Sequence, residues 1–236
     1  MDQNLLKTGT TTVGIVCKDG IVLAADKRST AGHMIANTKQ VKIIQITKFT
    51  ASTQSGLVSD AQLLTKVSKA ESALIKIRKQ REPKVKEVAS IMSSLSYHNI
   101  RQSSMVQGIV GFMVGGYDES GFHLYDVGID GSLTEYNNFN STGSGSLFAY
   151  GVLESKYKEG LSVEEGMKLA FEAVNTAIQK DSASGNGIDI IKITKEKGYE
   201  HVLTKQLNTK LEFWLIENKI KNSVQIKFEW NIQINY

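Results

Sequence analysis

Residues 9–26 read GTTTVGIVCKDGIVLAAD, two apolar, β-branched runs separated by Lys18-Asp19. β-Branched residues suit the pleated surface of a strand, and an Asp-Gly step between two such runs is a strong hairpin signal. We therefore expect two antiparallel strands joined by a tight turn at Asp19-Gly20. Thr10 starts the first strand and Asp26 ends the second, so the hairpin makes them neighbours.

Thr10 has two interpretations. A run of three threonines can simply be a good opening for a strand. If the chain is cut after Gly9, however, Thr10 carries a hydroxyl group and a free α-amine on one residue. A free α-amine has a pKa of about 7.7–8.0, so it can accept the hydroxyl proton directly or through a water. Such an amine-activated threonine is a known nucleophile.

The composition is that of a soluble globular protein. The 236 residues are 41% hydrophobic and 22% charged, which indicates one large domain or, as the alternative, two small ones. The net charge of +4 comes from scattered Lys and Arg and gives no nucleic-acid-binding arm. No apolar run is long enough to cross a membrane, and residues 1–9 lack the apolar centre of a secretory signal. A cytoplasmic location is the default expectation, and the single cysteine, Cys17, excludes an internal disulfide.

The rest of the chain alternates groups of strands with pairs of helices. β-Branched or apolar runs predict strands, and apolar spacing of three and four predicts helices. The expected strands lie at 41–46, 49–56, 105–114, 122–127, 132–139, 188–194 and 199–203. The expected helices begin near Ser59, Pro83, Ser146 and Ser162. This order predicts an α+β fold, a four-layer αββα sandwich of two antiparallel sheets flanked by helices.

The C-terminus has a strand pattern of its own. Between Val224 and Ile234, apolar residues alternate strictly with polar ones, which is the period of a strand with one apolar face. A long strand at a terminus exposes an edge that can pair with a partner or aggregate.

Several motifs occur in a fixed order along the chain. They are TGTTTVGI at 8–15, DKRSTAG at 26–32, Lys42, Gly56 with DAQ at 60–62, STGSGS at 141–146, YGVLE at 150–154 and DSASG at 181–185. Together they resemble the catalytic type of archaeal proteasome β subunit, and separated motifs in one order are more specific than any single one. The resemblance implies the N-terminal nucleophile hydrolase fold and a threonine endopeptidase without metal or cofactor.

The resemblance also implies a division of the chain. Residues 1–9 would be a propeptide removed by autolysis between Gly9 and Thr10, residues 10–217 the hydrolase domain, and residues 218–236 a C-terminal extension with a β-strand. The implied catalytic residues are the nucleophile Thr10 and six supporting residues. Lys42 would lie beside the Thr10 hydroxyl and be oriented by Asp26, the Gly56 backbone N–H would supply the oxyanion hole, and the network around the threonine amine would be Ser144, Asp181 and Ser184.

Each supporting residue also has an ordinary structural interpretation. Asp26 and Asp181 can cap a strand and a loop, Lys42 can be solvated, and Gly56 can serve a tight turn. The small-residue loop around Ser144 precedes a helix, as in phosphate-binding loops, but it lacks the lysine of a P-loop.

A substrate pocket beside the nucleophile is implied at Ser29, Thr30, Gln40, Ile44, Gln54, Val58 and Gln62. Archaeal relatives usually have an apolar residue where Gln54 stands, and they prefer large apolar substrate side chains. The Gln54 amide needs a hydrogen-bond partner in a desolvated pocket. We therefore expect a weaker or altered apolar preference.

The resemblance implies a cylindrical assembly as the working state. The expected partners are other β subunits in a heptameric ring, α-subunit rings, a regulatory unfolding ATPase acting through the α ring, and unfolded protein substrates, with no nucleic acid and no membrane. One alternative is a structural β-ring subunit that is never processed, and another is a different amidase of the same fold. The intact set of Thr10, Asp26 and Lys42 argues against the first alternative. The STGSGS and DSASG loops at 141–146 and 181–185 argue against the second.

Overall fold

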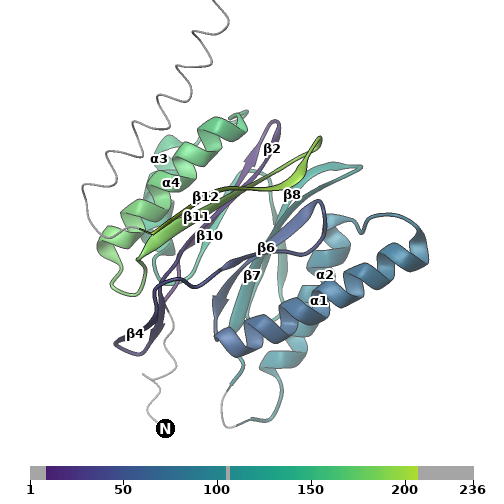
Figure 1. Ribbon diagram of the computed structural model, residues 1–236, viewed down its shortest axis with the longest axis horizontal. Helices are drawn as coiled ribbons and strands as arrows, with labels where there is room; N and C mark the ends of the chain where they lie inside the picture. The colour runs from purple at the N-terminus through teal and green to yellow at the C-terminus, as the bar shows by residue number, and fades with distance from the viewer. Residues whose placement is uncertain (1–8, 105–106, 207–236) are drawn as a thin grey trace, which may run out of the picture.

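The computed structural model describes residues 9–104 and 107–206 (Figure 1). Its elements in chain order are β1 (Thr12–Cys17), β2 (Gly20–Asp26), β3 (Ser29–Ala31), β4 (Met34–Asn37), β5 (Ile43–Gln45), β6 (Thr50–Gly56), α1 (Val58–Lys79), α2 (Val85–Ile100), β7 (Val110–Asp118), β8 (Gly121–Val127), β9 (Leu133–Tyr136), β10 (Phe139–Thr142), α3 (Ser146–Lys156), α4 (Val163–Lys180), β11 (Gly187–Thr194) and β12 (Gly198–Gln206).

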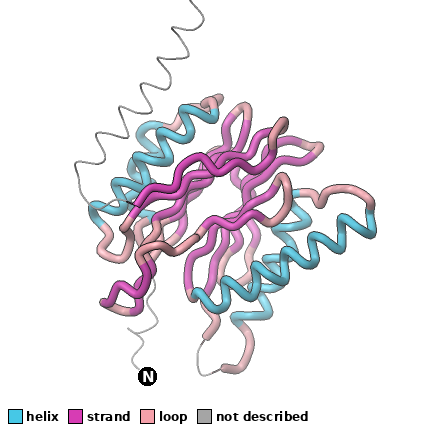
Figure 2. The backbone as a smooth tube through the Cα atoms, in the orientation of Figure 1, coloured by secondary structure: helices cyan, strands magenta, loops and turns pink. Residues whose placement is uncertain are grey.

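Two antiparallel sheets form the centre of the fold. One has the strand order β10-β1-β2-β11-β12 and the other the order β5-β6-β7-β8-β9, while β3 and β4 form a separate hairpin. Helices α3 and α4 cover the outer face of the first sheet, and α1 and α2 cover the outer face of the second (Figures 1 and 2). The predicted four-layer αββα sandwich is confirmed.

Apolar side chains fill all three spaces between these layers. The inter-sheet core contains Leu23 from β2, Met113 from β7 and Leu124 from β8, all fully buried. The two sheets approach closely at Gly14, where an added Cβ would lie 2.4 Å from Met113 Sδ. Tight packing at this point fixes the distance between the sheets, and therefore the position of residues at the open end of the sandwich.

The first hairpin forms as the sequence predicts, except that Lys18 and Asp19 make the turn and Gly20 already pairs with Cys17. β1 and β2 pair antiparallel, with Thr12 opposite Ala25. The backbone N–H of Asp26 donates to Thr11 O at 3.1 Å, which extends the ladder to the start of the chain's first strand. Asp26 therefore lies beside the threonine run, because a tight two-residue turn leaves no freedom in the register.

Two parts of the expected strand pattern differ in the structure. The single strand expected at 132–139 is two strands, β9 and β10, which belong to different sheets. The Asn138 side chain accepts a hydrogen bond from Phe139 N at 2.7 Å, and such local bonds compete with a continuing ladder. The β3–β4 hairpin, with Gly32 in its turn, was not expected because its two strands are only three and four residues long.

The expected alternating strand at 223–236, and the rest of the extension 218–236, lie outside the described residues. Within the described part of the chain, no helix is both long and apolar enough to span a bilayer.

Candidate active site

The β1–β2 hairpin places the Asp26 carboxylate at the start of the threonine run. Asp26 is fully buried. Its Oδ1 accepts a hydrogen bond from Thr11 N at 2.9 Å, and its Oδ2 accepts from Arg28 N and Gly185 N, both at 3.0 Å. Three backbone donors fix the orientation of this carboxylate.

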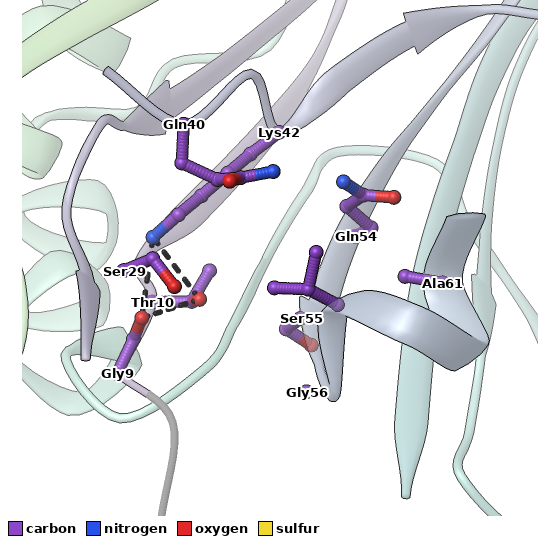
Figure 3. A pocket seen from close by; sticks show the side chains of 10 residues that line it. Gly9, Thr10, Ser29, Gln40, Lys42, Gln54, Ser55, Gly56 and Ala61 are labelled. Carbon is purple, nitrogen blue, oxygen red and sulfur yellow. Dashed lines mark hydrogen bonds between the residues drawn. The ribbon is translucent and has the colours of Figure 1, made fainter. Parts of the chain in front are cut away.

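Lys42 enters the same site from the segment before β5. Its Nζ donates to Asp26 Oδ1 at 2.7 Å, to Thr10 Oγ1 at 3.1 Å and to Gly9 O at 3.2 Å (Figure 3). The side chain is only 4% exposed. Burial lowers the pKa of Lys42 below its usual value of 10.5, and the adjacent Asp26 carboxylate opposes that shift. The Lys42 amine therefore loses its proton more readily than a solvated lysine does.

Thr10 is held from both sides while its bond to Gly9 is intact. The Thr10 hydroxyl donates to Gly9 O at 2.6 Å, and the Thr10 backbone N–H donates to Ser144 Oγ at 3.2 Å. Gly9 N donates to Thr30 Oγ1 at 2.8 Å. The Thr10 hydroxyl, the Lys42 amine and the Gly9 carbonyl therefore lie within hydrogen-bond distance of one another.

A second hydrogen-bonded group supports the Thr10 nitrogen. Ser144 Oγ donates to Asp181 Oδ2 at 2.6 Å, and Ser184 Oγ donates to the same oxygen at 2.7 Å. The Ser184 hydroxyl also lies 2.7 Å from Thr11 Oγ1. The structure therefore brings together the three residues predicted around the amine, and it adds Thr11, which was expected only as a strand residue.

Gly143 lets the β10–α3 loop approach Thr10. Its φ is +95°, a left-handed conformation that favours glycine, and an added Cβ would lie 2.1 Å from Thr10 O. The loop position next to Ser144 therefore requires glycine on both conformational and steric grounds.

A first pocket lies beside Thr10 and contains four of the seven predicted substrate-binding residues. Its lining is Gly9, Thr10, Ser29, Gln40, Lys42, Gln54, Ser55, Gly56, Val58 and Ala61 (Figure 3). The prediction missed Ser55 and Ala61. Ala61 lies one helical turn after Val58 on α1, so helical spacing would have identified it.

Three predicted substrate-binding residues do not line this pocket. Thr30 instead binds the backbone N–H of Gly9. Gln62 is exposed on α1, next to the lining residue Ala61. Ile44 is partly buried in β5, two residues beyond Lys42.

A second pocket lies on the other side of Thr10 and Gly56, with a volume of about 450 Å³. Its remaining walls come from β6, from β7 and the residue before it, from the end of β8 and the loop after it, and from Thr142 and Gly143 before α3. Gly56, the predicted oxyanion-hole residue, borders both pockets.

Comparisons with known proteins point to one family. The sequence model of the proteasome subunit family matches residues 6–193. A proteasome subunit beta of Ferroglobus placidus is 44% identical over 204 residues, which cover 86% of this chain and 95% of the relative. Proteasome subunit beta 2 of Aeropyrum pernix is 43% identical over 85% of this chain and 88% of its own length. A proteasome subunit beta of Methanohalophilus mahii is 42% identical over 90% of this chain and 99% of its own length.

Proposed function

The chain belongs to the proteasome subunit family, and from this premise we propose that it is a catalytic β subunit of the proteasome core that hydrolyses peptide bonds with Thr10. The observation that carries the proposal is the contact of one buried cation with two groups. Lys42 Nζ binds both the Asp26 carboxylate and the Thr10 hydroxyl. A solvated lysine or a simple strand cap would need neither contact.

In the processed chain, the free amine of Thr10 takes the proton of its own hydroxyl as Oγ attacks the substrate carbonyl. The Lys42 cation favours the developing alkoxide, and the Gly56 N–H would stabilise the oxyanion. One such donor is worth roughly 3–4 kcal/mol in the transition state. The amine then returns the proton to the leaving nitrogen. A water hydrolyses the resulting ester, with the same amine as base.

Removal of residues 1–9 needs a different base, because the Thr10 nitrogen is then an amide. A water held near Thr10 is the proposed base, and the Lys42 cation, whose Nζ lies 3.1 Å from Thr10 Oγ1, would stabilise the alkoxide that forms. Thr30 anchors the Gly9 backbone, and this contact keeps the bond to be cleaved next to the hydroxyl. Cleavage there would leave a hydrolase domain from residue 10 to 217.

The assembly partners proposed are neighbouring β subunits in a heptameric ring, α-subunit rings, an unfolding ATPase and unfolded protein substrates, in the cytoplasm. Large apolar side chains on separate elements support an assembled state. Met34 is 69% exposed, Ile77 65% and Leu147 80%. Exposed apolar surface of this kind marks protein interfaces.

The extension 218–236 is proposed to add a strand to a neighbouring subunit. Deletion of residues 223–236 should then weaken ring assembly, as measured by native mass spectrometry of the complex with α subunits. Unchanged assembly would argue against strand addition.

The decisive experiment for the catalytic proposal is intact mass of the protein co-expressed with proteasome α subunits. The wild-type chain should lose residues 1–9, whereas Thr10→Ala should retain them and show no peptidase activity. Thr12→Ala is the control, because the Thr12 hydroxyl binds the Thr142 hydroxyl and none of the groups around the Thr10 hydroxyl or nitrogen. If the wild-type chain keeps residues 1–9, it is the structural subunit instead. If Thr10→Ala is processed and active, Thr10 is not the nucleophile.

A further inference from the structure

The second pocket contains one carboxylate beside the nucleophile. Asp126 is the only residue with an ionisable side chain among those that line it: Thr10, Ser55, Gly56, Ile109, Gly111, Asp126, Val127, Gly128, Ile129, Thr142 and Gly143. The predicted site residues do not include it.

Strand alternation explains why Asp126 faces this pocket. Along β8, Tyr125 and Val127 pack against α1 and α2, whereas Leu124 packs in the inter-sheet core. Asp126 shares the face of Leu124, because residues two apart lie on the same side of a strand. It is the next inward position after Leu124, where the sandwich opens beside Thr10. An acidic residue thus occupies a position for which the strand pattern favours an apolar one.

The environment of Asp126 does not compensate its charge. Within the described residues, no group donates a hydrogen bond to the Asp126 carboxylate. Its partners in the neighbouring strands are Met113 on β7 and Thr134 on β9, neither of which carries a charge. Burial raises the pKa of Asp126 to about 6, and the nearby Asp130 adds to this shift. A cationic group in the pocket would supply the missing partner.

The Gly9–Thr10 bond indicates which substrate residue reaches this pocket. Gly9 contributes the carbonyl of that bond and lines the first pocket. The first pocket therefore takes the side chain of the residue before a cleaved bond. Thr10 and Gly56 border both pockets, so we expect the residue after the cleaved bond on the side of the second pocket.

We propose that Asp126 selects peptide substrates with lysine or arginine directly after the cleaved bond. The assignment rests on the proposed peptidase function and names a substrate class for it. A lysine or arginine side chain that enters the pocket replaces the missing partner of the carboxylate, and a glutamate at the same substrate position meets like charge. The pocket volume of about 450 Å³ leaves room for either long cationic side chain.

The test uses the particle assembled from the full chain and proteasome α subunits. Internally quenched peptides identical except for Lys, Arg, Ala or Glu after the cleaved bond are compared at about pH 8, with mass spectrometry to confirm the cleavage position. We expect kcat/KM for Lys or Arg to exceed that for Glu by about tenfold, as for a hydrogen bond to a charged group. Asp126→Asn should reduce this ratio to about twofold or less.

Asp130→Asn is the matched control, since Asp130 is exposed, lies four residues away and does not line the pocket. Asp130 raises the pKa of Asp126 only through space, and Asp126 is charged at about pH 8 with or without it, so this variant should retain most of the wild-type ratio. A wild-type ratio near one, or an unchanged ratio in Asp126→Asn, overturns the assignment. Cleavage no faster than in a Thr10→Ala particle overturns the proposed function itself, which separates the two failures.

The wild-type particle provides a second measurement if Asp126→Asn fails to assemble. Asp130 and Tyr150 interact electrostatically with Asp126. Thr10, whose amine is free in a processed chain, lines the same pocket. Burial raises the pKa of Tyr150, so it stays neutral. Protonation of Asp126 should therefore make the Lys-to-Glu ratio fall several-fold between about pH 8 and pH 5.5. The Thr10 amine affects both substrates and largely cancels in the ratio. A pH-independent ratio overturns the assignment.

Discussion

Lys42 and Asp26 form an ion pair that is closed off from solvent, with 2.7 Å between Nζ and Oδ1 and side chains only 4% and 0% exposed. The same Nζ contacts the Thr10 hydroxyl, so this ion pair contributes both to the stability of the fold and to the proposed reaction. The removal of one partner leaves a buried charge, which typically costs about 3–5 kcal/mol.

Lys42→Met should therefore abolish loss of the leader and lower the free energy of unfolding. The loss of stability should lie near the smaller end of that range, because three backbone donors still bind Asp26. The double variant with Asp26→Asn should regain much of the stability but no processing. Intact mass and chemical denaturation measure the two effects separately.

The second buried pair provides the control. Lys27 Nζ binds Asp189 at 2.8 Å, away from Thr10. Lys27→Met should cost a similar amount of stability and still be processed wherever it folds. A processed Lys42→Met chain would contradict the proposed role of the lysine.

Gly143→Ala should block processing. Its Cβ would lie 2.1 Å from Thr10 O, so either Thr10 or the loop with Ser144 must move. A displacement of about 1 Å in a catalytic group can cost roughly a hundredfold in rate. Gly121→Ala is the control, because Gly121 also has a positive φ, +130°, but nothing lies within 4 Å of its added Cβ. It should remain active with a loss of roughly 1 kcal/mol in stability. Equal processing of both variants, measured by intact mass, would show that the close approach is unimportant.

The parts of the fold that depend on local chemistry could be predicted from the sequence. The turn after Cys17 fixes the β1–β2 register, and the register alone puts Asp26 next to the threonine run. Lys42 is different. It reaches Asp26 through the separate segment before β5, so only the family resemblance identified its partner in advance.

Helix α1 shows why periodicity cannot assign burial. Leu63, Leu74 and Ile77 belong to an apolar series with helical spacing, yet they are 59%, 39% and 65% exposed. Leu64 is buried instead and packs in the cluster with residues of β7 and β8, and Ser68 is fully buried as well. An apolar series indicates a helix face that favours burial, but it does not tell whether that face is buried in the protein's own core or against a partner protein. Asp126 was missed for a related reason, since a single carboxylate in an apolar strand gives no periodic signal.

Gln54 should set the preference for the residue before the cleaved bond. It is 7% exposed, its Nε2 donates to Val41 O at 3.1 Å, and its Oε1 has no hydrogen-bond partner among the described residues. A large apolar substrate side chain would leave that acceptor desolvated, which costs free energy. Gln54→Val should therefore raise kcat/KM for substrates with Leu or Phe at this position by about tenfold relative to Gln or Ala.

A fluorogenic peptide panel measures the preference, with the exposed Gln45→Val on β5 as the control. If the wild-type particle already cleaves after large apolar residues far faster than after all others, the predicted effect of Gln54 is wrong.

Asp126→Asn should stabilise the fold at neutral pH. The pKa of Asp126 is raised from 3.8 to about 6, so the folded state holds this proton more tightly than the unfolded state. The penalty for the charged form is absent well below pH 3.8, grows as the pH rises to about 6 and is constant above that. After allowance for solvent screening, the gain in Asp126→Asn should reach roughly 1–2 kcal/mol at pH 8.

Asp130 should behave in the opposite way. Hydrogen bonds from Ser132 lower the pKa of Asp130, so its charged form is favoured in the fold and its contribution is lost as the pH falls. Asp130→Asn should therefore give no gain at pH 8. Urea denaturation of both variants across this pH range measures the difference. A functional residue often lowers the stability of the fold. If the effect of Asp126→Asn does not change with pH, the charge of the Asp126 carboxylate is already stabilised by other groups in the folded chain.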